Sequence, residues 1–267
     1  MDRNCPEELR DDPESAYTDS KSLIERWHGK GRLGYAITPR FALTSSDAQL
    51  EAAGRLADEY PDVWIHTHLA ENTDEVEEVA QLFPDSKSYL DVYDRYGLLR
   101  ERSVFAHCLH MNGDDRRCMA EKGGAAAFCP TSNLFLGSGL FDLQSMRDAQ
   151  VRCGLGTDIG GGTSLSLLRT AGEAYKVLHL QGQALPATRA LYLATLGAAE
   201  ALYLDDKIGN FEVGKEADFV VLDPSASSIT ARRNNSASSI EEKLFALMML
   251  ADDRNVAATF INGQQTS

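Results

Sequence analysis

The sequence predicts an α/β fold built around a parallel sheet. From about residue 34, short apolar runs alternate with amphipathic stretches, a pattern typical of consecutive β-α units. Five such units follow one another, so either a barrel or a doubly wound sheet is expected. With 43% hydrophobic and 25% charged residues, the 267-residue chain has the composition of a globular protein with a sizeable core.

The first part of the chain supplies the strands and helices of these units. The expected strands are residues 34–38, 63–68, 103–107, 125–129 and 151–156. The expected helices between them are residues 47–59, 73–82, 89–96, 114–122 and 141–149. Ser46 is placed to cap the first helix, and Gly97 and Gly123 are placed to end two of the others.

After Ser164 the pattern becomes mainly helical. Helices are expected at residues 165–181 and 186–202, and Pro186 is suited to open the second one. Two further strands are expected at residues 219–222 and 256–261. Residues 225–239 are rich in Ser, Asn and Arg, so they predict a mobile surface loop.

The charge and the apolar runs exclude several classes of protein. The formal net charge of −14 opposes non-specific binding to nucleic acid or to anionic lipid. No apolar run approaches the roughly 18 to 20 residues that a membrane helix needs. We therefore expect a cytoplasmic protein that binds neither nucleic acid nor membrane, with its five cysteines as reduced, buried thiols.

Polar side chains follow four of the expected strands at their carboxyl ends. His68, His107 and Asp158 each lie at or just past a strand end, and Arg40 follows the strand at 34–38. In a parallel barrel the β-to-α loops meet at this rim, where active sites lie. Two imidazoles and one carboxylate suit zinc or iron, which can activate a water molecule. Their donor atoms should then lie within about 4 to 5 Å of one another, although hydrogen-bonded structural histidines remain an alternative.

Two neighbours of His68 need separate interpretation. His66 shares a strand face with His68, but it lies deeper in the strand, so we expect it to pack inside or to support the site rather than to bind metal. Glu71 lies in the loop that opens the next helix. It either stabilises the start of that helix or acts as a general acid/base carboxylate.

Several motifs, taken in order, resemble the amidohydrolase superfamily. They are T-P-R-F at 38–41, H-T-H-L-A-E-N at 66–72, V-F-A-H at 104–107, C-P-T-S-N at 129–133 and G-T-D at 156–158. Residues 208–223 are similar to the superfamily's return strand into a small β-sandwich. Within the superfamily the likeness is greatest to the guanine deaminase family, through T-P-R-F, N-L-F-L-G-S-G-L-F at 133–141 and G-G-G-T at 160–163.

The resemblance makes the expected fold more specific. It implies an incomplete TIM-type (β/α)8 barrel of the metal-dependent amidohydrolase type, with remnants of a small β-sandwich at the carboxyl end. The partial barrel is expected at residues 1–205. Residues 206–267 are expected to hold the β-sandwich strands and a helix.

The resemblance also implies a reaction, the hydrolysis of guanine to xanthine and ammonia. One zinc ion per site, or alternatively iron, would be held by His68, His107 and Asp158. Glu71 would shuttle a proton, and Asp158 would accept the proton of the attacking water. Arg40 and Phe41 would hold the purine, which would also contact His68, Glu71 and Asp158. The resemblance further implies a homodimer.

The sequence departs from the family pattern in three places. No upstream H-x-H pair precedes Trp27, Phe128 stands where a His is usual, and Ala70 stands where Ser is common. We therefore expect an amino-terminally shortened member with about five of the eight barrel strands and little deaminase activity of its own. The alternatives are another amidohydrolase, acting on an aminated heterocycle or a nucleoside, and a non-catalytic fragment.

Overall fold

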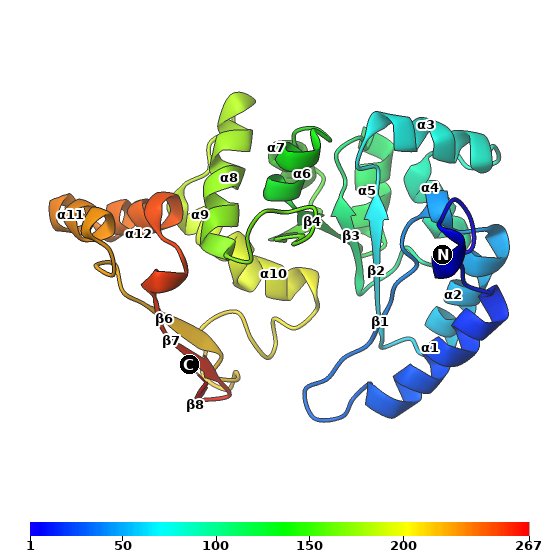
Figure 1. Ribbon diagram of the computed structural model, residues 1–267, viewed down its shortest axis with the longest axis horizontal. Coiled ribbons are helices and arrows are strands. Elements are labelled where there is room, and N and C mark those ends of the chain that lie inside the picture. Colours follow the sequence, from blue (N-terminus) through cyan, green and yellow to red (C-terminus); the bar gives the residue numbers. More distant parts are fainter. Residues whose placement is uncertain (267) are drawn as a thin grey trace. The chain divides into compact units, whose positions relative to one another are not determined.

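The computed structural model describes residues 1–266, which form two compact units (Figure 1). One unit is Met1–Ala127 with Ser145–Arg152, and the other is Phe128–Gln144 with residues 153–266. Within the described residues, one sheet has five strands in the order β1-β2-β3-β4-β5. These strands are β1 (Ala36–Ile37), β2 (Trp64–Leu69), β3 (Ser103–His107), β4 (Ala125–Phe128) and β5 (Arg152–Leu155). Pairing is parallel from β1 through β4, which confirms the expected sheet.

The first unit surrounds the early strands with helices. They are α1 (Pro13–Trp27), α2 (Asp47–Glu59), α3 (Thr73–Leu82), α4 (Tyr89–Arg95), α5 (Gly113–Glu121) and most of α7 (Leu143–Asp148), with the 3-10 turns η1 (Glu7–Leu9) and η2 (Ala42–Thr44). Ser46 caps α2 by accepting a hydrogen bond from the Gln49 amide at 3.2 Å. Tyr93 and Phe105 are fully buried, so the core of this unit lies between α4 and β3.

The second unit is mostly helical and ends in a small sheet. Its helices are α6 (Pro130–Leu136), α8 (Leu167–Leu180), α9 (Ala187–Ala194), α10 (Leu196–Ala201), α11 (Ser228–Ser236) and α12 (Ile240–Leu250), with the 3-10 turn η3 (Asp253–Asn255). The antiparallel sheet consists of β6 (Phe219–Leu222), β7 (Val256–Ile261) and β8 (Gln264–Gln265). Phe219 stacks on Phe260 across β6 and β7, with ring centroids 4.5 Å apart. Phe128 is buried and stacks on Phe141.

Two expectations for this second unit are wrong. The segment 225–239 contains helix α11, because Ser227 and Thr230 form a capping box that starts a helix despite the polar composition. The segment 186–202 is two helices, broken at Thr195, whose φ of −130° and ψ of −99° are not helical. Pro186 is the N-cap of α9 rather than its first residue. The division near residue 205 remains a prediction.

Two other sequence expectations concern the cysteines and membrane spans. All five cysteines carry thiols rather than disulfides; Cys108, Cys129 and Cys153 are buried, but Cys5 and Cys118 are partly exposed. Burial raises the pKa of Cys153 to about 12. No helix among residues 1–266 combines the length and the apolar character that a membrane crossing requires.

Candidate functional site

The ends of β2 and β3 place two histidines side by side. In the parallel register His68 pairs with Ala106 and Leu69 pairs with His107, so the two imidazoles emerge at the same edge of the sheet. Their rings stack with centroids 5.5 Å apart and an interplanar angle of 18°. His107 is buried and His68 is partly exposed.

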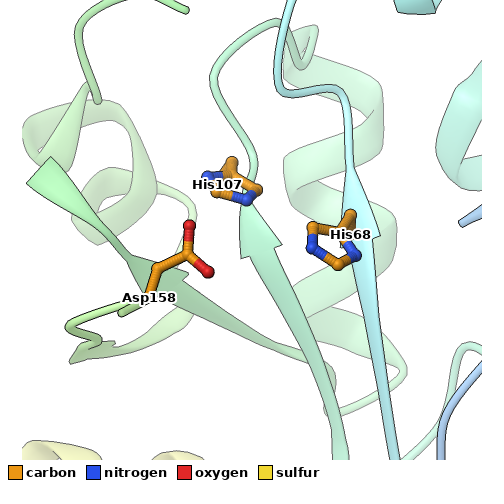
Figure 2. A group of neighbouring side chains, drawn as sticks. All are labelled: His68, His107 and Asp158. Carbon is orange, nitrogen blue, oxygen red and sulfur yellow. The ribbon is translucent and has the colours of Figure 1, made fainter. Parts of the chain in front are cut away.

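Asp158 joins the two histidines in one group of possible metal ligands. One ligand atom from each of His68, His107 and Asp158 lies within 4.8 Å of the others (Figure 2). This confirms the expected distance of about 4 to 5 Å. His66 lies outside the group, as expected, but it is exposed, so the expectation that it packs in the interior is wrong.

The backbone is strained where these residues leave the sheet. Ala70, His107, Cys108 and Asp158 all have positive φ values, between 47° and 72°. Such left-handed conformations cost a non-glycine residue about 1 kcal/mol or more, and they concentrate at functional sites. At His107 and Asp158 the strained residue is itself a member of the ligand group.

A hydrogen bond to Arg40 determines the tautomer of His68. The Nδ1 atom of His68 lies 2.6 Å from the carbonyl oxygen of Arg40. A carbonyl can only accept, so Nδ1 must carry the proton and donate it. In the neutral ring the lone pair is then on Nε2, which is the arrangement usual for a metal-binding histidine.

Glu71 lies close to this histidine pair. Its Oε2 atom is 3.7 Å from Nε2 of His107, and its side chain is only 16% exposed. The cap of α3 is formed by Asn72 and Glu75, which make a capping box. The hydrogen bonds of the cap are thus made by other residues, and the acid/base role of Glu71 stays a prediction.

A pocket adjoins His68 within the first unit. It has a volume of about 360 Å³ and is lined in part by Arg40, Phe41, His68 and Glu71. The guanidinium carbon of Arg40 lies 5.1 Å from the centroid of the Phe41 ring, and the Phe41 ring lies 5.7 Å from that of His68. The pocket therefore offers a cation and an aromatic face beside one possible metal ligand.

The residues that support this pocket were missed in the sequence. Glu75 is buried and accepts hydrogen bonds from the Glu71 amide at 3.1 Å and from the Tyr89 hydroxyl at 2.5 Å. Tyr93 lies one turn further along α4, and burial raises the pKa of both tyrosines, so their hydroxyls stay protonated at neutral pH. The N-x-x-E spacing of Asn72 and Glu75 is a signal that could have identified Glu75.

Comparison with known proteins identifies the family. A family model described as "Amidohydrolase family" matches residues 1–266. The chain belongs to this family. Members of the amidohydrolase family are metal-dependent, and the group formed by His68, His107 and Asp158 is a possible metal site.

Individual relatives give a finer comparison. The chain is 54% identical to the guanine deaminase of Escherichia coli (strain K12) over 264 residues, 99% of this chain and 60% of the relative. The solved structure titled "E. coli Guanine Deaminase" has a TM-score of 0.99, and the match covers 100% of this chain and 62% of that one.

Two further solved structures are similar to this amidohydrolase. The guanine deaminase from C. acetobutylicum, with guanine bound in its active site, is 27% identical with a TM-score of 0.91, covering 99% of this chain and 63% of that one. An adenosine deaminase from Xanthomonas campestris with bound zinc is 27% identical with a TM-score of 0.87, and the match covers 98% of this chain and 58% of that one. The chain thus spans about 60% of the length of the proteins it matches.

Proposed function

We propose that this chain carries the metal-binding and purine-binding residues of a guanine deaminase, which hydrolyses guanine to xanthine and ammonia. One observation carries the proposal: His68 belongs both to the group of possible metal ligands and to the wall of the pocket with Arg40 and Phe41. A bound purine would therefore lie next to the metal. The guanine deaminases among the similar proteins support the same substrate.

We assign zinc to His68, His107 and Asp158. Two imidazoles and one carboxylate are a donor set that zinc accepts, although iron accepts it as well. The proton on Nδ1 of His68 leaves the lone pair of the neutral ring on Nε2, where a metal could bind. A metal held by these residues would lower the pKa of a water molecule and so would supply a nucleophile near neutral pH.

Arg40 and Phe41 would bind the purine. The guanidinium has several N–H donors in one plane, so it can donate to the oxygen and N7 of guanine and stabilise the charge that develops on the ring. The Phe41 ring can stack on a base face. Their spacing of 5.1 Å places the cation and the aromatic face within reach of one small heterocycle.

Glu71 and Asp158 would move the protons. Attack at C2 of guanine requires a base for the proton of the attacking water, and the Asp158 carboxylate is suited to accept it. The departing amino group needs a proton to leave as ammonia. The Glu71 carboxyl, partly enclosed and 3.7 Å from His107, is suited to deliver it.

The proposal is tested in a chimera in which this chain replaces the matching stretch of the Escherichia coli guanine deaminase. The expected result is one xanthine and one ammonia for each guanine consumed, with a metal ion bound. Adenosine and cytosine, as other aminated heterocycles, serve as comparison substrates. A folded, metal-loaded chimera that deaminates either of them faster than guanine, or that deaminates none of the three, contradicts the proposal.

The location and assembly of the protein are finer points of the same proposal. The family resemblance implies a homodimer and the sequence predicts a cytoplasmic location, and both features stay predictions. Size-exclusion chromatography with light scattering would measure the mass of the assembly directly.

A further inference from the structure

A hydrogen-bond network joins the segment that carries Arg40 and Phe41 to the end of β2. The carbonyl oxygen of Arg40 accepts from Nδ1 of His68 at 2.6 Å, from the His68 amide at 3.3 Å and from the Thr67 hydroxyl at 3.1 Å. These bonds fix the Arg40 backbone next to the ligand histidine.

The hydroxyl of Tyr93 makes a second link between the same two segments. It accepts the amide N–H of Ala42 at 2.9 Å and donates to the carbonyl oxygen of His68 at 2.7 Å. It also lies 3.2 Å from the Thr67 hydroxyl. Phe41 therefore lies between two anchored positions, the carbonyl of Arg40 and the amide of Ala42, and the Arg40 side chain directly precedes the first of them.

Tyr93 is itself held firmly. The residue is fully buried on α4, and its ring packs against Phe105 at 5.5 Å and Tyr89 at 5.8 Å between centroids. Ala42 is fully buried as well, so water is not at hand to replace the hydroxyl as the partner of its amide. An unsatisfied buried donor costs about 1–3 kcal/mol.

We propose that Tyr93 is a positioning residue that holds the Arg40–Phe41 segment against the His68 end of β2. Its effect on catalysis rests on the proposed function, since it acts through the residues assigned to purine and metal. Without the hydroxyl, the Ala42 amide loses its acceptor, and the segment is free to shift away from His68. Purine binding and the orientation of the His68 ring should both become less well defined.

The structural part of this proposal is tested by Tyr93→Phe in the full 267-residue chain. Amide hydrogen exchange is measured at Ala42 and compared with the Ile65 amide, which donates to the Arg102 carbonyl at 3.0 Å. Loss of one hydrogen bond of ordinary strength corresponds to roughly tenfold faster exchange at Ala42 relative to Ile65. The nitrogen chemical shifts of His68, measured by NMR, should also move.

Two control variants separate positioning from a loss of stability. Val92→Ala removes buried apolar volume from the same helix but no hydrogen bond of this network. It should therefore raise the exchange rates of the Ala42 and Ile65 amides by similar factors and leave their ratio unchanged. Tyr96→Phe removes a hydroxyl that bonds to Asp47 instead, so Ala42 should exchange as in the unchanged chain. An Ala42-to-Ile65 ratio in Tyr93→Phe equal to that in Val92→Ala overturns the proposal.

The catalytic part is tested in the chimera with steady-state kinetics. Tyr93→Phe should raise KM for guanine roughly tenfold and change kcat by less than about threefold, because a loosened binding segment weakens binding more than chemistry. An unchanged KM overturns the catalytic part of the proposal. If the unsubstituted chimera does not turn over guanine, the proposed function fails, and the exchange ratio at Ala42 still decides whether Tyr93 holds the segment.

Discussion

The Nδ1 nitrogen of His68 lies 2.6 Å from the carbonyl oxygen of Arg40, so a possible metal ligand and a possible purine-binding residue share one hydrogen bond. This bond leaves the Nε2 lone pair of the neutral imidazole for a metal ion. It also places the Arg40 side chain at a pocket that His68 itself lines. Metal binding and purine binding are thus expected to depend on one another at this position.

Replacing Glu71 by Gln in the chimera should lower kcat by roughly 10² to 10⁴, because the amide cannot transfer the proton. Metal content should stay the same, since Glu71 is outside the ligand group. Glu77→Gln, which alters an exposed carboxylate on α3, is the matched control and should leave kcat unchanged. Near-normal turnover of the Glu71→Gln chimera would eliminate the shuttle role.

Replacing Arg40 by Ala should act mainly through kcat/KM for guanine, with a loss of roughly 10- to 100-fold. Arg40→Lys should recover only part of this loss, because a lysine ammonium lacks the planar set of donors. Arg55→Ala, at an exposed arginine on α2, controls for the loss of one positive charge. Equal kcat/KM values for Arg40→Ala and Arg55→Ala would show that Arg40 does not hold the substrate.

Replacing Gly162 by Ala should weaken zinc binding by the full chain at least about tenfold. An added Cβ would lie 1.9 Å from the carbonyl oxygen of Thr157, so the turn that carries Asp158 would have to move. Gly113→Ala is the matched control, because its nearest neighbour would be the end of the Arg117 side chain at 3.6 Å. Isothermal titration with zinc chloride measures the zinc affinity of each variant. Equal affinities for Gly162→Ala and Gly113→Ala would show that the turn at Gly162 does not affect metal binding.

Replacing Glu75 by Gln should lower the free energy of unfolding by about 1–3 kcal/mol, since Glu75 is a buried acceptor for the Glu71 amide and the Tyr89 hydroxyl. Glu77→Gln again serves as the control and should change stability by less than about 0.5 kcal/mol. Urea unfolding followed by circular dichroism gives both values. A stability for Glu75→Gln equal to the control would mean that the buried carboxylate is not needed.

Local patterns in the sequence were sufficient for the strand ends and for several helices. The helices at Asp47–Glu59 and Thr73–Leu82 begin and end at the predicted residues, and Ser46 is the cap that the sequence predicts for the first of them. Strand periodicity also placed His68 and His107 at neighbouring strand ends. These features depend on residues close together in the chain.

Features that depend on distant residues were not predictable in this way. The hydroxyl of Tyr93 bonds to the amide of Ala42 across 51 positions of sequence, and no periodicity in either segment signals that pairing.

Some local features were also missed. Helices α1 and α6 were not predicted from the sequence, and α11 was mistaken for a loop because the Ser and Asn content of this segment outweighed its capping box. Polar composition alone does not exclude a capped helix.

Zinc titration of the metal-free chain tests the proposed metal centre, and with it the proposed chemistry, most directly. The unsubstituted chain should bind one zinc ion, and His68→Ala should weaken the affinity by at least about 100-fold because a ligand is lost. His66→Ala should bind zinc as the unsubstituted chain does, since His66 is exposed and lies outside the ligand group. Equal zinc affinities for His66→Ala and His68→Ala, or no zinc binding by the unsubstituted chain, would contradict the account.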